Sequence, residues 1–438
     1  MKIKKLEIHN FRSFRQATLE FPDSNLAVFI GVNGQGKSSL LDLIAMFLNQ
    51  ISVNLIGQDY ADALYRIYYT DINIESNKSS NQIWLDVQNI QLVEMKSYAE
   101  NVGAISTCGM DRLSSYDEFL RNLVIQISKE KEKALLPILL YYRANRYFDN
   151  NYEFSVDKIP YKVPQFRAYE NAFSKKITDF KDFINWFRDE EDKENELIKK
   201  ERNFDITNPN LQPVRKAVTT FFSQLNSFPF GNLRVERDSP NARNFALAGF
   251  SSSLVISKNN QDFRLEQLSD GEKMLLMVVC DIARRLSIAN PGLSDPLEGQ
   301  GIVLIDEIEL HLHPKWQREV IPALMATFPN IQFIVTTHSP QVLSRVDSEN
   351  IFLLKDGEVL KLSSNPKGLD TNVILEEIMD TPKYPREVDD LIENLFSLIE
   401  QRKFSEAEDT RKKIAELSPD NPVLQRADAM IERLKILN

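Results

Sequence analysis

The sequence is poor in cysteine, histidine and long apolar runs, and each shortage excludes a class of protein. The 438 residues include two cysteines and four histidines, too few for a disulfide framework or a cysteine-based zinc set. The longest apolar runs, "LLPILLYY" and "MLLMVVC", are too short to span a membrane. The opening "MKIKKLEIHNF" alternates like a strand and lacks the continuous apolar stretch of a signal peptide. We therefore expect a cytoplasmic protein without membrane contact.

Positive charge is also in deficit, since the formal net charge is −10 at pH 7. This balance excludes a uniformly basic nucleic-acid binder, so any DNA contact has to use a local patch. The 438 residues are enough for two or three domains and a large buried core. Hydrophobic residues make up 42% of the chain, so most of it should fold.

Apolar periodicity predicts an alternation of strands and helices along most of the chain. The block 268–355 alternates helix and strand as a mostly parallel sheet does. The charged segment 186–203 is expected to be a solvated helix face or a contact for a partner or DNA. The predicted strands are 2–10 (at a sheet edge), 26–31 and 137–148; the turns are Asn259-Asn260 and Asp356-Gly357; the helices are 37–50, 179–203, 208–226, 386–402, 404–417 and 421–436.

A glycine-rich loop, "GVNGQGKS", lies between the apolar strand 26–31 and the helix that follows. The pattern G-x-x-x-x-G-K-[ST] in this context predicts a phosphate-binding P-loop. Its glycines let backbone N–H groups approach the phosphates, the lysine supplies a positive charge, and Ser38 offers a hydroxyl ligand to Mg²⁺. The predicted ATP-binding residues of this loop are Gly31, Val32, Asn33, Gly34, Gln35, Gly36, Lys37, Ser38 and Ser39.

Two further apolar strands end in residues suited to nucleotide chemistry. "GIVLIDE" delivers Asp306, a candidate Mg²⁺ ligand, and Glu307, which is placed to polarise an attacking water. "IVTTHSP" delivers His338, which can hold the leaving group and the water. Taken alone, the acidic pair also fits a solvated turn, and the histidine also fits a hydrogen-bonded core residue.

The segment "ELHLHP" places His311 and His313 two residues apart, on one face of an extended chain. A zinc site needs three or four ligands, and no cysteine or further histidine lies nearby in the sequence. Loop packing or a subunit contact is the simpler interpretation.

A second anion-binding segment, "LSDGEK", starts a helix at 268–273. Exposed backbone N–H groups and the helix dipole attract anions at such a start. The chain therefore carries two phosphate-binding segments more than two hundred residues apart.

The order of these motifs resembles the ABC-type ATPase head of the SMC, RecF and OLD-like families. The opening "IHNFRSF" resembles their first strand, whose arginine reaches the bound nucleotide, so the resemblance assigns this role to Arg12. "GVNGQGKS" is similar to their Walker A motif, "LSDGEK" to their signature motif, "IVLIDE" to their Walker B motif, and "TTHSP" to the segment with their switch histidine. "IELHLHP" stands where their D-loop lies. The resemblance implies an α/β fold, ATP and Mg²⁺ as ligands, and Glu307 and His338 as catalytic residues.

In that group the signature motif binds the nucleotide held by the P-loop of a second protomer, so the resemblance implies a homo-oligomer of heads. The residues that would bind ATP in trans are Ser269, Asp270, Gly271 and Glu272. Asp270 stands where the group often has glycine. The Q-loop glutamine of the group has no clear counterpart, and "YYRANR" (141–146) stands at about its place; its tyrosines and arginines fit either base stacking or the end of a core strand.

We expect four regions on this basis. They are an N-terminal part of the head with a mixed insertion (1–134), an inserted, mainly helical lobe (135–260), the C-terminal part of the head (261–365), and a C-terminal helical region for partner binding or oligomerisation (366–438). Whether that last region packs against a partner or against the head is open.

A narrower resemblance joins "FINWFRDEEDKENE" (183–196) and the helical tail 404–434 to the PtuA family, the ATPase subunits of the Septu antiphage system, which also occur as retron effector components. It implies a separate HNH nuclease partner, PtuB-like, and assembly into larger oligomers. Two alternatives stay open: a RecF-like DNA-repair ATPase, and a nucleotide-binding scaffold that hydrolyses ATP negligibly.

Overall fold

The computed structural model describes residues 1–56, 67–87, 90–102, 105–144, 163–173, 181–225, 229–237, 252–362 and 364–436. The sequence expectations for 145–148 and 242–250 lie outside these residues. The chain forms two compact units, Met1–Gly368 and Leu369–Asn438, and the division falls close to the start of the expected C-terminal region at 366.

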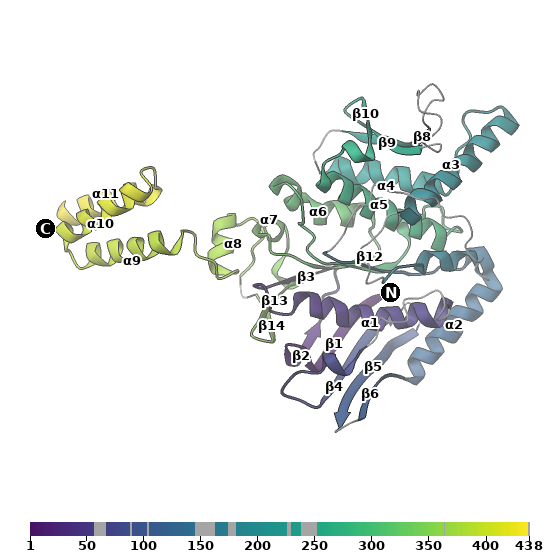
Figure 1. The fold of residues 1–438 in the computed structure, drawn as a ribbon, viewed down its shortest axis with the longest axis horizontal. Coiled ribbons are helices and arrows are strands. Elements are labelled where there is room, and N and C mark those ends of the chain that lie inside the picture. Colours follow the sequence, from purple (N-terminus) through teal and green to yellow (C-terminus); the bar gives the residue numbers. More distant parts are fainter. Residues whose placement is uncertain are drawn as a thin grey trace, which may run out of the picture. The chain divides into compact units, whose positions relative to one another are not determined.

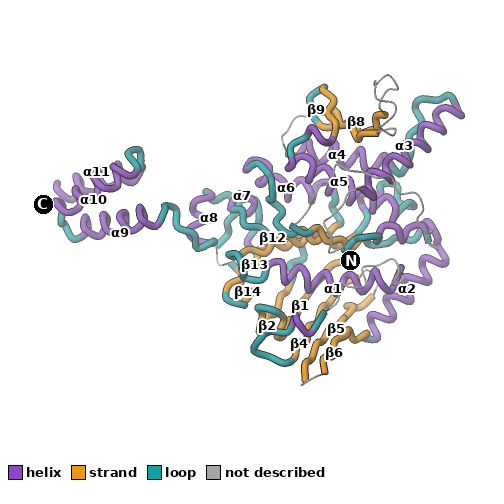
Figure 2. The backbone as a smooth tube through the Cα atoms, in the orientation of Figure 1, coloured by secondary structure: helices purple, strands orange, loops and turns teal. Residues whose placement is uncertain are grey.

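A six-stranded sheet forms the centre of the first unit (Figures 1 and 2). Its strand order is β14-β13-β3-β12-β11-β7, parallel except for the hairpin of β13 and β14. Four of these strands are buried along their whole length, which explains their continuous apolar sequences. The strands are β3 (Leu26–Ile30), β7 (Ile138–Tyr142), β11 (Gly301–Ile305), β12 (Ile331–Thr336), β13 (Ile351–Lys355) and β14 (Glu358–Lys361).

A five-stranded antiparallel sheet has the order β2-β1-β4-β5-β6. Figure 1 shows α1 (Lys37–Ile56) between this sheet and the central one. The expected edge strand at 2–10 is wrong in one respect: β1 lies between β2 and β4 and pairs with both. The strands are β1 (Lys2–Phe11), β2 (Phe14–Glu20), β4 (Lys78–Val87), β5 (Ile90–Val102) and β6 (Ile105–Arg112), and α2 (Ser114–Glu130) packs on β5.

The helix α1 is long and apolar enough to cross a membrane by length and composition alone. Most of its residues are buried inside the unit, however, which is how the core helix of a two-layered head packs.

On the other side of the central sheet lie α5 (Asp270–Ala289), α4 (Leu211–Gln224), α6 (Pro314–Thr327) and the short α7 (Pro340–Leu343). A small sheet of β8 (Phe230–Arg237), β9 (Ser252–Lys258) and β10 (Gln261–Arg264) packs with α4, and we call this sheet the accessory sheet. The expected turn at Asn259-Asn260 joins β9 to β10, and both residues have positive φ. We expected a separate lobe over residues 135–260. The first residues of that range do not belong to such a lobe, because β7 is a strand of the central sheet.

The charged helix α3 (Lys181–Glu201) differs from the expected solvated face. Glu190, Glu191 and Glu194, in the middle of the helix, are buried and accept hydrogen bonds. Both Nη atoms of Arg215 donate to Glu194 at 2.9 Å. Buried carboxylates are tolerated when they are paired in this way. Its last turns are largely exposed.

The second unit contains α8 (Thr371–Glu377), α9 (Arg386–Glu400), α10 (Phe404–Leu417) and α11 (Pro422–Ile436). The last three helices begin and end close to the predicted ranges. Their apolar sides pack on one another through a core that includes Leu395, Ile399 and Ile414.

Candidate nucleotide site

The carboxyl ends of four neighbouring parallel strands meet at one edge of the central sheet. The register pairs Ile305 with both Val335 and Tyr142, and Thr336 with Phe29. The segments that follow these strands therefore share the edge where α/β sheets bind ligands. They are the P-loop, the Walker B acids, the His338 segment and Arg143.

The P-loop needs its glycines for backbone reasons. Gly34 and Gly36 have φ of +86° and +91°, and a Cβ on Gly31 would lie 2.5 Å from the carbonyl oxygen of Leu354. The loop is braced from β13, since the backbone N–H of Asp356 donates to Oε1 of Gln35 at 2.7 Å. Val32, Asn33, Gly34 and Ser38 are exposed at the crest of the loop, where a phosphate group can reach them.

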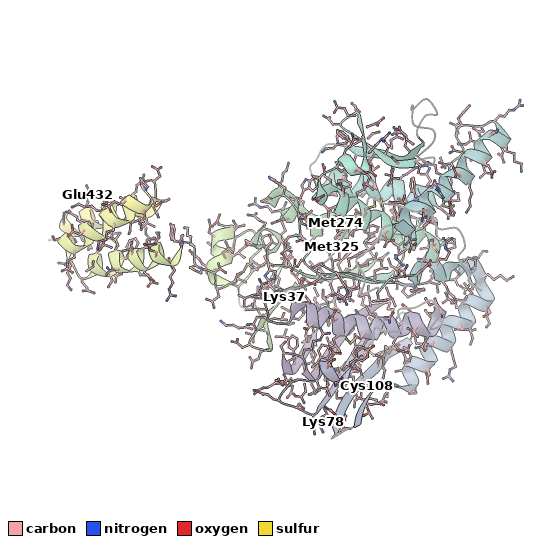
Figure 3. The ribbon with its side chains drawn as sticks, in the orientation of Figure 1. Lys37, Lys78, Cys108, Met274, Met325 and Glu432 are labelled. Carbon is pink, nitrogen blue, oxygen red and sulfur yellow. The ribbon has the colours of Figure 1, made fainter. Side chains whose placement is uncertain are left out.

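Lys37 lies at the first turn of α1 (Figure 3) and is buried. Its Nζ donates to the carbonyl oxygens of Gly31 at 2.9 Å and Val32 at 3.2 Å, so the side chain curls back over the loop. Burial lowers the pKa of Lys37, and the charges of Asp306, Glu307 and Glu309 oppose that shift. The lysine and the acids therefore belong to one electrostatic cluster.

Thr336 organises the Walker B acids. Its hydroxyl donates to Oδ1 of Asp306 at 2.6 Å and accepts the backbone N–H of Glu307 at 2.8 Å. Glu307 has φ of +49°, a conformation that non-glycine residues rarely adopt.

The predicted Mg²⁺ ligands, Ser38 and Asp306, are oxygen donors of the kind Mg²⁺ prefers. Within the described ranges, no group of three or more His, Cys, Asp or Glu side chains could hold a metal by itself. A Mg²⁺ ion bound with nucleotide phosphates and waters needs only one or two protein ligands, so this donor set fits Mg²⁺ bound together with ATP.

His338 enters the same cluster, and Glu309 holds its backbone. The N–H of His338 donates to Oε1 of Glu309 at 2.5 Å. Burial and then the charge of Lys37 lower the pKa of His338, against the opposing charges of Glu309, Glu307 and Asp306. Both effects favour the neutral imidazole, which is the form that can accept a proton from water. Glu309 was not among the predicted site residues.

Each of the two histidines of "ELHLHP" makes a structural contact. His313 is the N-cap of α6, where its Nδ1 accepts the backbone N–H of Lys315 at 3.3 Å. His311 has φ of +62°, and its carbonyl oxygen would lie 2.5 Å from a Cβ on Gly271. The segment thus connects the signature motif to Walker B by packing.

Arg12 lies beside α1, held by two carboxylates. Its Nη1 donates to Asp42 at 2.8 Å and to Ser39 at 3.3 Å, and its Nε donates to Asp71 at 2.9 Å. Asp42 also accepts Nη2 of Arg143 at 2.9 Å. Sequence reasoning missed Asp42, although its position four residues after Ser38 places it on the same face of α1.

In the signature motif, Ser269 is the N-cap of α5 in a capping box with Glu272. Oε2 of Glu272 accepts both the hydroxyl of Ser269 at 2.9 Å and its backbone N–H at 3.0 Å. Lys258 of the accessory sheet donates to the other carboxylate oxygen at 2.5 Å. Asp270 is exposed and pairs with Lys273, so its carboxylate lies on the surface of the motif.

A buried ion cluster joins the signature helix to the central sheet. Asp281 of α5 accepts hydrogen bonds from Arg284, Arg285 and the hydroxyl of Tyr142, the last at 2.8 Å. The carbonyl oxygen of Tyr142 accepts the backbone N–H of Asp306 at 2.8 Å. Tyr142 thus links the signature helix to the Walker B segment through two hydrogen bonds.

Two family models and several known proteins match this chain. A model described as "AAA domain, putative AbiEii toxin, Type IV TA system" matches residues 142–344, and one described as "AAA domain" matches residues 5–212. The retron Ec83 probable ATPase of Escherichia coli is 30% identical over 486 residues, covering 99% of this chain and 87% of that protein.

Two further relatives extend the comparison. The retron Vc95 probable ATPase of Vibrio cholerae serotype O1 biovar El Tor is 29% identical over 458 residues, covering 94% of this chain and 87% of that protein. The Septu protein PtuA of Bacillus mycoides (strain KBAB4) is 26% identical over 362 residues, covering 81% of this chain and 41% of that protein. The chain therefore belongs to the family of the retron Ec83 probable ATPase, to which the Septu protein PtuA is a more distant relative.

Proposed function

We propose that the chain binds ATP with Mg²⁺ at the edge of the central sheet and hydrolyses it there. The P-loop holds the phosphates, Lys37 neutralises their charge, and Ser38 and Asp306 hold the metal. Glu307 acts as the base for the attacking water, and the neutral imidazole of His338 orients that water. The observation that carries this proposal is that the P-loop, the Walker B acids and the His338 segment follow parallel strands that end at one edge of the central sheet.

The second part of the proposal is that two heads close around two ATP molecules. Ser269 has its polar contacts within its own motif, with Glu272, while Lys37 contacts its own P-loop. Each chain thus offers a phosphate-binding loop and a separate anion-binding helix start, as two half-sites of a head-to-tail dimer require. The N–H groups at Asp270 and Gly271 would bind the partner's nucleotide in trans.

The third part is that this closure regulates a separate HNH nuclease in antiphage defence, in an assembly larger than a dimer. The family relationship supports this part, because relatives include a retron ATPase and a Septu protein.

One variant tests the nucleotide site. Lys37→Ala removes the charge that faces the phosphates, so ATP affinity and ATP-driven association of the chain are both expected to fall below detection. Equilibrium binding of a fluorescent ATP analogue and sedimentation with and without ATP and Mg²⁺ measure the two properties. Wild-type affinity in Lys37→Ala would contradict the site assignment.

A second variant tests the order of closure and hydrolysis. Glu307→Gln keeps the shape of the side chain but removes the base, so it is expected to trap the closed, ATP-bound dimer with turnover at least about a hundredfold lower. Normal turnover in Glu307→Gln would remove Glu307 from its role. A wild-type chain that dimerises on ATP but does not hydrolyse it would instead be a nucleotide-binding scaffold.

Purification from the native host identifies the partner. We expect a stoichiometric small HNH protein to co-purify, and its retention to depend on ATP and Mg²⁺. Recombination proteins or DNA in its place would favour a RecF-like repair function.

A further inference from the structure

Glu309 is a half-buried acid of the proposed ATPase centre, and its two carboxylate oxygens have different surroundings. Oε1 accepts the backbone N–H of His338 at 2.5 Å. Oε2 is buried and, within the described part of the chain, has no hydrogen-bond donor. One carboxylate oxygen is therefore satisfied by a hydrogen bond, and the other lacks one.

The backbone around Glu309 fixes its direction. Glu307 and His311, two residues to either side, have φ of +49° and +62°. The N–H of Leu310 donates to the carbonyl of Glu307, and that of Leu312 to the carbonyl of Glu309, so the segment is a succession of tight turns. These turns fix the backbone conformation around Glu309 and so restrict the direction of its side chain.

The charge of Glu309 acts on both basic side chains of the site, Lys37 and His338. It opposes the fall in the pKa of Lys37 and in the pKa of His338, together with Asp306 and Glu307. A buried carboxylate oxygen without a donor is costly, and such groups in native proteins mark strain or a function. Glu309 lies beside the residues that would receive the phosphates. A hydrogen-bond donor for its Oε2 could therefore arrive together with the nucleotide.

We propose that Glu309 is a positioning residue of the ATPase centre: Oε1 fixes the His338 segment, and Oε2 accepts a hydrogen bond from a water ordered by bound ATP. This inference rests on the proposed ATPase function and adds a second acid to it. Glu309 acts through His338 and that water, while Glu307 remains the base.

The test compares Glu309→Gln with Glu319→Gln, a matched control on α6 whose carboxylate pairs with Arg345 at 2.6 Å. Glutamine keeps an acceptor for the N–H of His338 but removes the charge and puts an N–H₂ group at one of the two positions. We expect kcat to fall about tenfold to a hundredfold, the usual loss for an outer-shell partner, with KM for ATP within about twofold. The control is expected to keep both values.

A second readout uses the nucleotide-free protein. The carboxylate of Glu309 raises the pKa of His338, so its removal is expected to move that pKa further down. The other groups that act on His338, namely Lys37, Asp306 and Glu307, are unchanged in the variant. An NMR titration measures the imidazole, whose signal among four histidines is assigned with His338→Asn.

The outcomes separate this inference from the proposed function. A wild-type chain with no more turnover than Lys37→Ala refutes the ATPase function. Normal wild-type turnover, with kcat of Glu309→Gln within about twofold of it or with an unmoved pKa of His338, refutes the role of Glu309. If Glu309→Gln does not fold, Glu309→Asp serves instead: it keeps the charge and shortens the reach, so kcat is expected to fall while the pKa of His338 stays.

Discussion

The contact between Lys258 and Glu272 gives a quantitative prediction about the signature motif. Lys258→Met removes the ammonium group that lies 2.5 Å from Oε1 of Glu272, where the side chains are 26% and 10% exposed. Loss of one partner leaves the other charge buried, which costs about 3–5 kcal/mol in well-buried pairs. Because Ser269 still donates twice to Glu272, we expect a smaller loss than that, about 2–3 kcal/mol in the free energy of unfolding.

A double-mutant cycle measures the pair itself. Lys258→Met, Glu272→Gln and the double variant are unfolded with urea at pH 7, and we expect a coupling energy of about 1–2 kcal/mol. Lys273→Met is the matched control, since its partner Asp270 is 78% exposed, and it is expected to cost less than about 0.5 kcal/mol. Effects of Lys258→Met and Glu272→Gln that add within about 0.3 kcal/mol would refute the contact.

The direction of the pKa shift of Glu272 predicts how the stabilisation by this pair changes with pH. Burial alone raises the pKa of Glu272, but Lys258 and Ser269 outweigh it and hold the pKa below its ordinary value. A carboxyl with a depressed folded pKa stabilises the protein above its unfolded pKa, and the stability is lost as pH falls through the folded value. The difference between wild type and Lys258→Met is therefore expected to shrink as pH falls below the unfolded pKa of about 4.3 towards the lower folded value. A constant difference would contradict the ionic origin of the effect.

Two other positions give direct tests by chemical denaturation. In Gly271→Ala the new Cβ would lie 2.5 Å from the carbonyl oxygen of His311; forced backbone shifts of this kind cost about 1–3 kcal/mol, and a loss below about 0.5 kcal/mol would refute the close approach. Asp281→Asn leaves Arg284 and Arg285 buried beside an amide, which costs about 3–5 kcal/mol at pH 7. Burial raises the pKa of Asp281, yet the two arginines lower it to about 2, so the stabilisation is complete above about pH 4 and lost towards pH 2. Equal unfolding free energies of wild type and Asp281→Asn at pH 7 would contradict the ion cluster.

The sequence predicted those parts of the site that local chemistry determines. The P-loop, the acids after β11 and the histidine after β12 each follow a short apolar strand, and that pattern is visible within ten residues. Parallel strands then bring their ends to one edge of the sheet whatever the connections between them. The hairpin turns at Asn259 and Asp356 were predictable for the same reason, since those residue types tolerate positive φ.

Contacts between distant segments were beyond sequence reasoning. Nothing near β1 shows that β4, some seventy residues later, pairs with its second side and removes it from the edge. The buried glutamates of α3 look like surface charges until Arg215 and the N–H of Val235 reach them from later elements. Asp42 and Glu309 were missed likewise, because their partners Arg143 and His338 come from other strands.

The left-handed backbone conformation of Glu307 affects which substitutions would stabilise the protein at this position. Holding a non-glycine residue there costs about 1 kcal/mol or more, and asparagine adopts that conformation more readily than glutamate. Glu307→Asn therefore relieves the backbone, but under the role proposed for Glu307 it also removes the base. The proposed activity and the stability of the fold thus make opposite demands on this position.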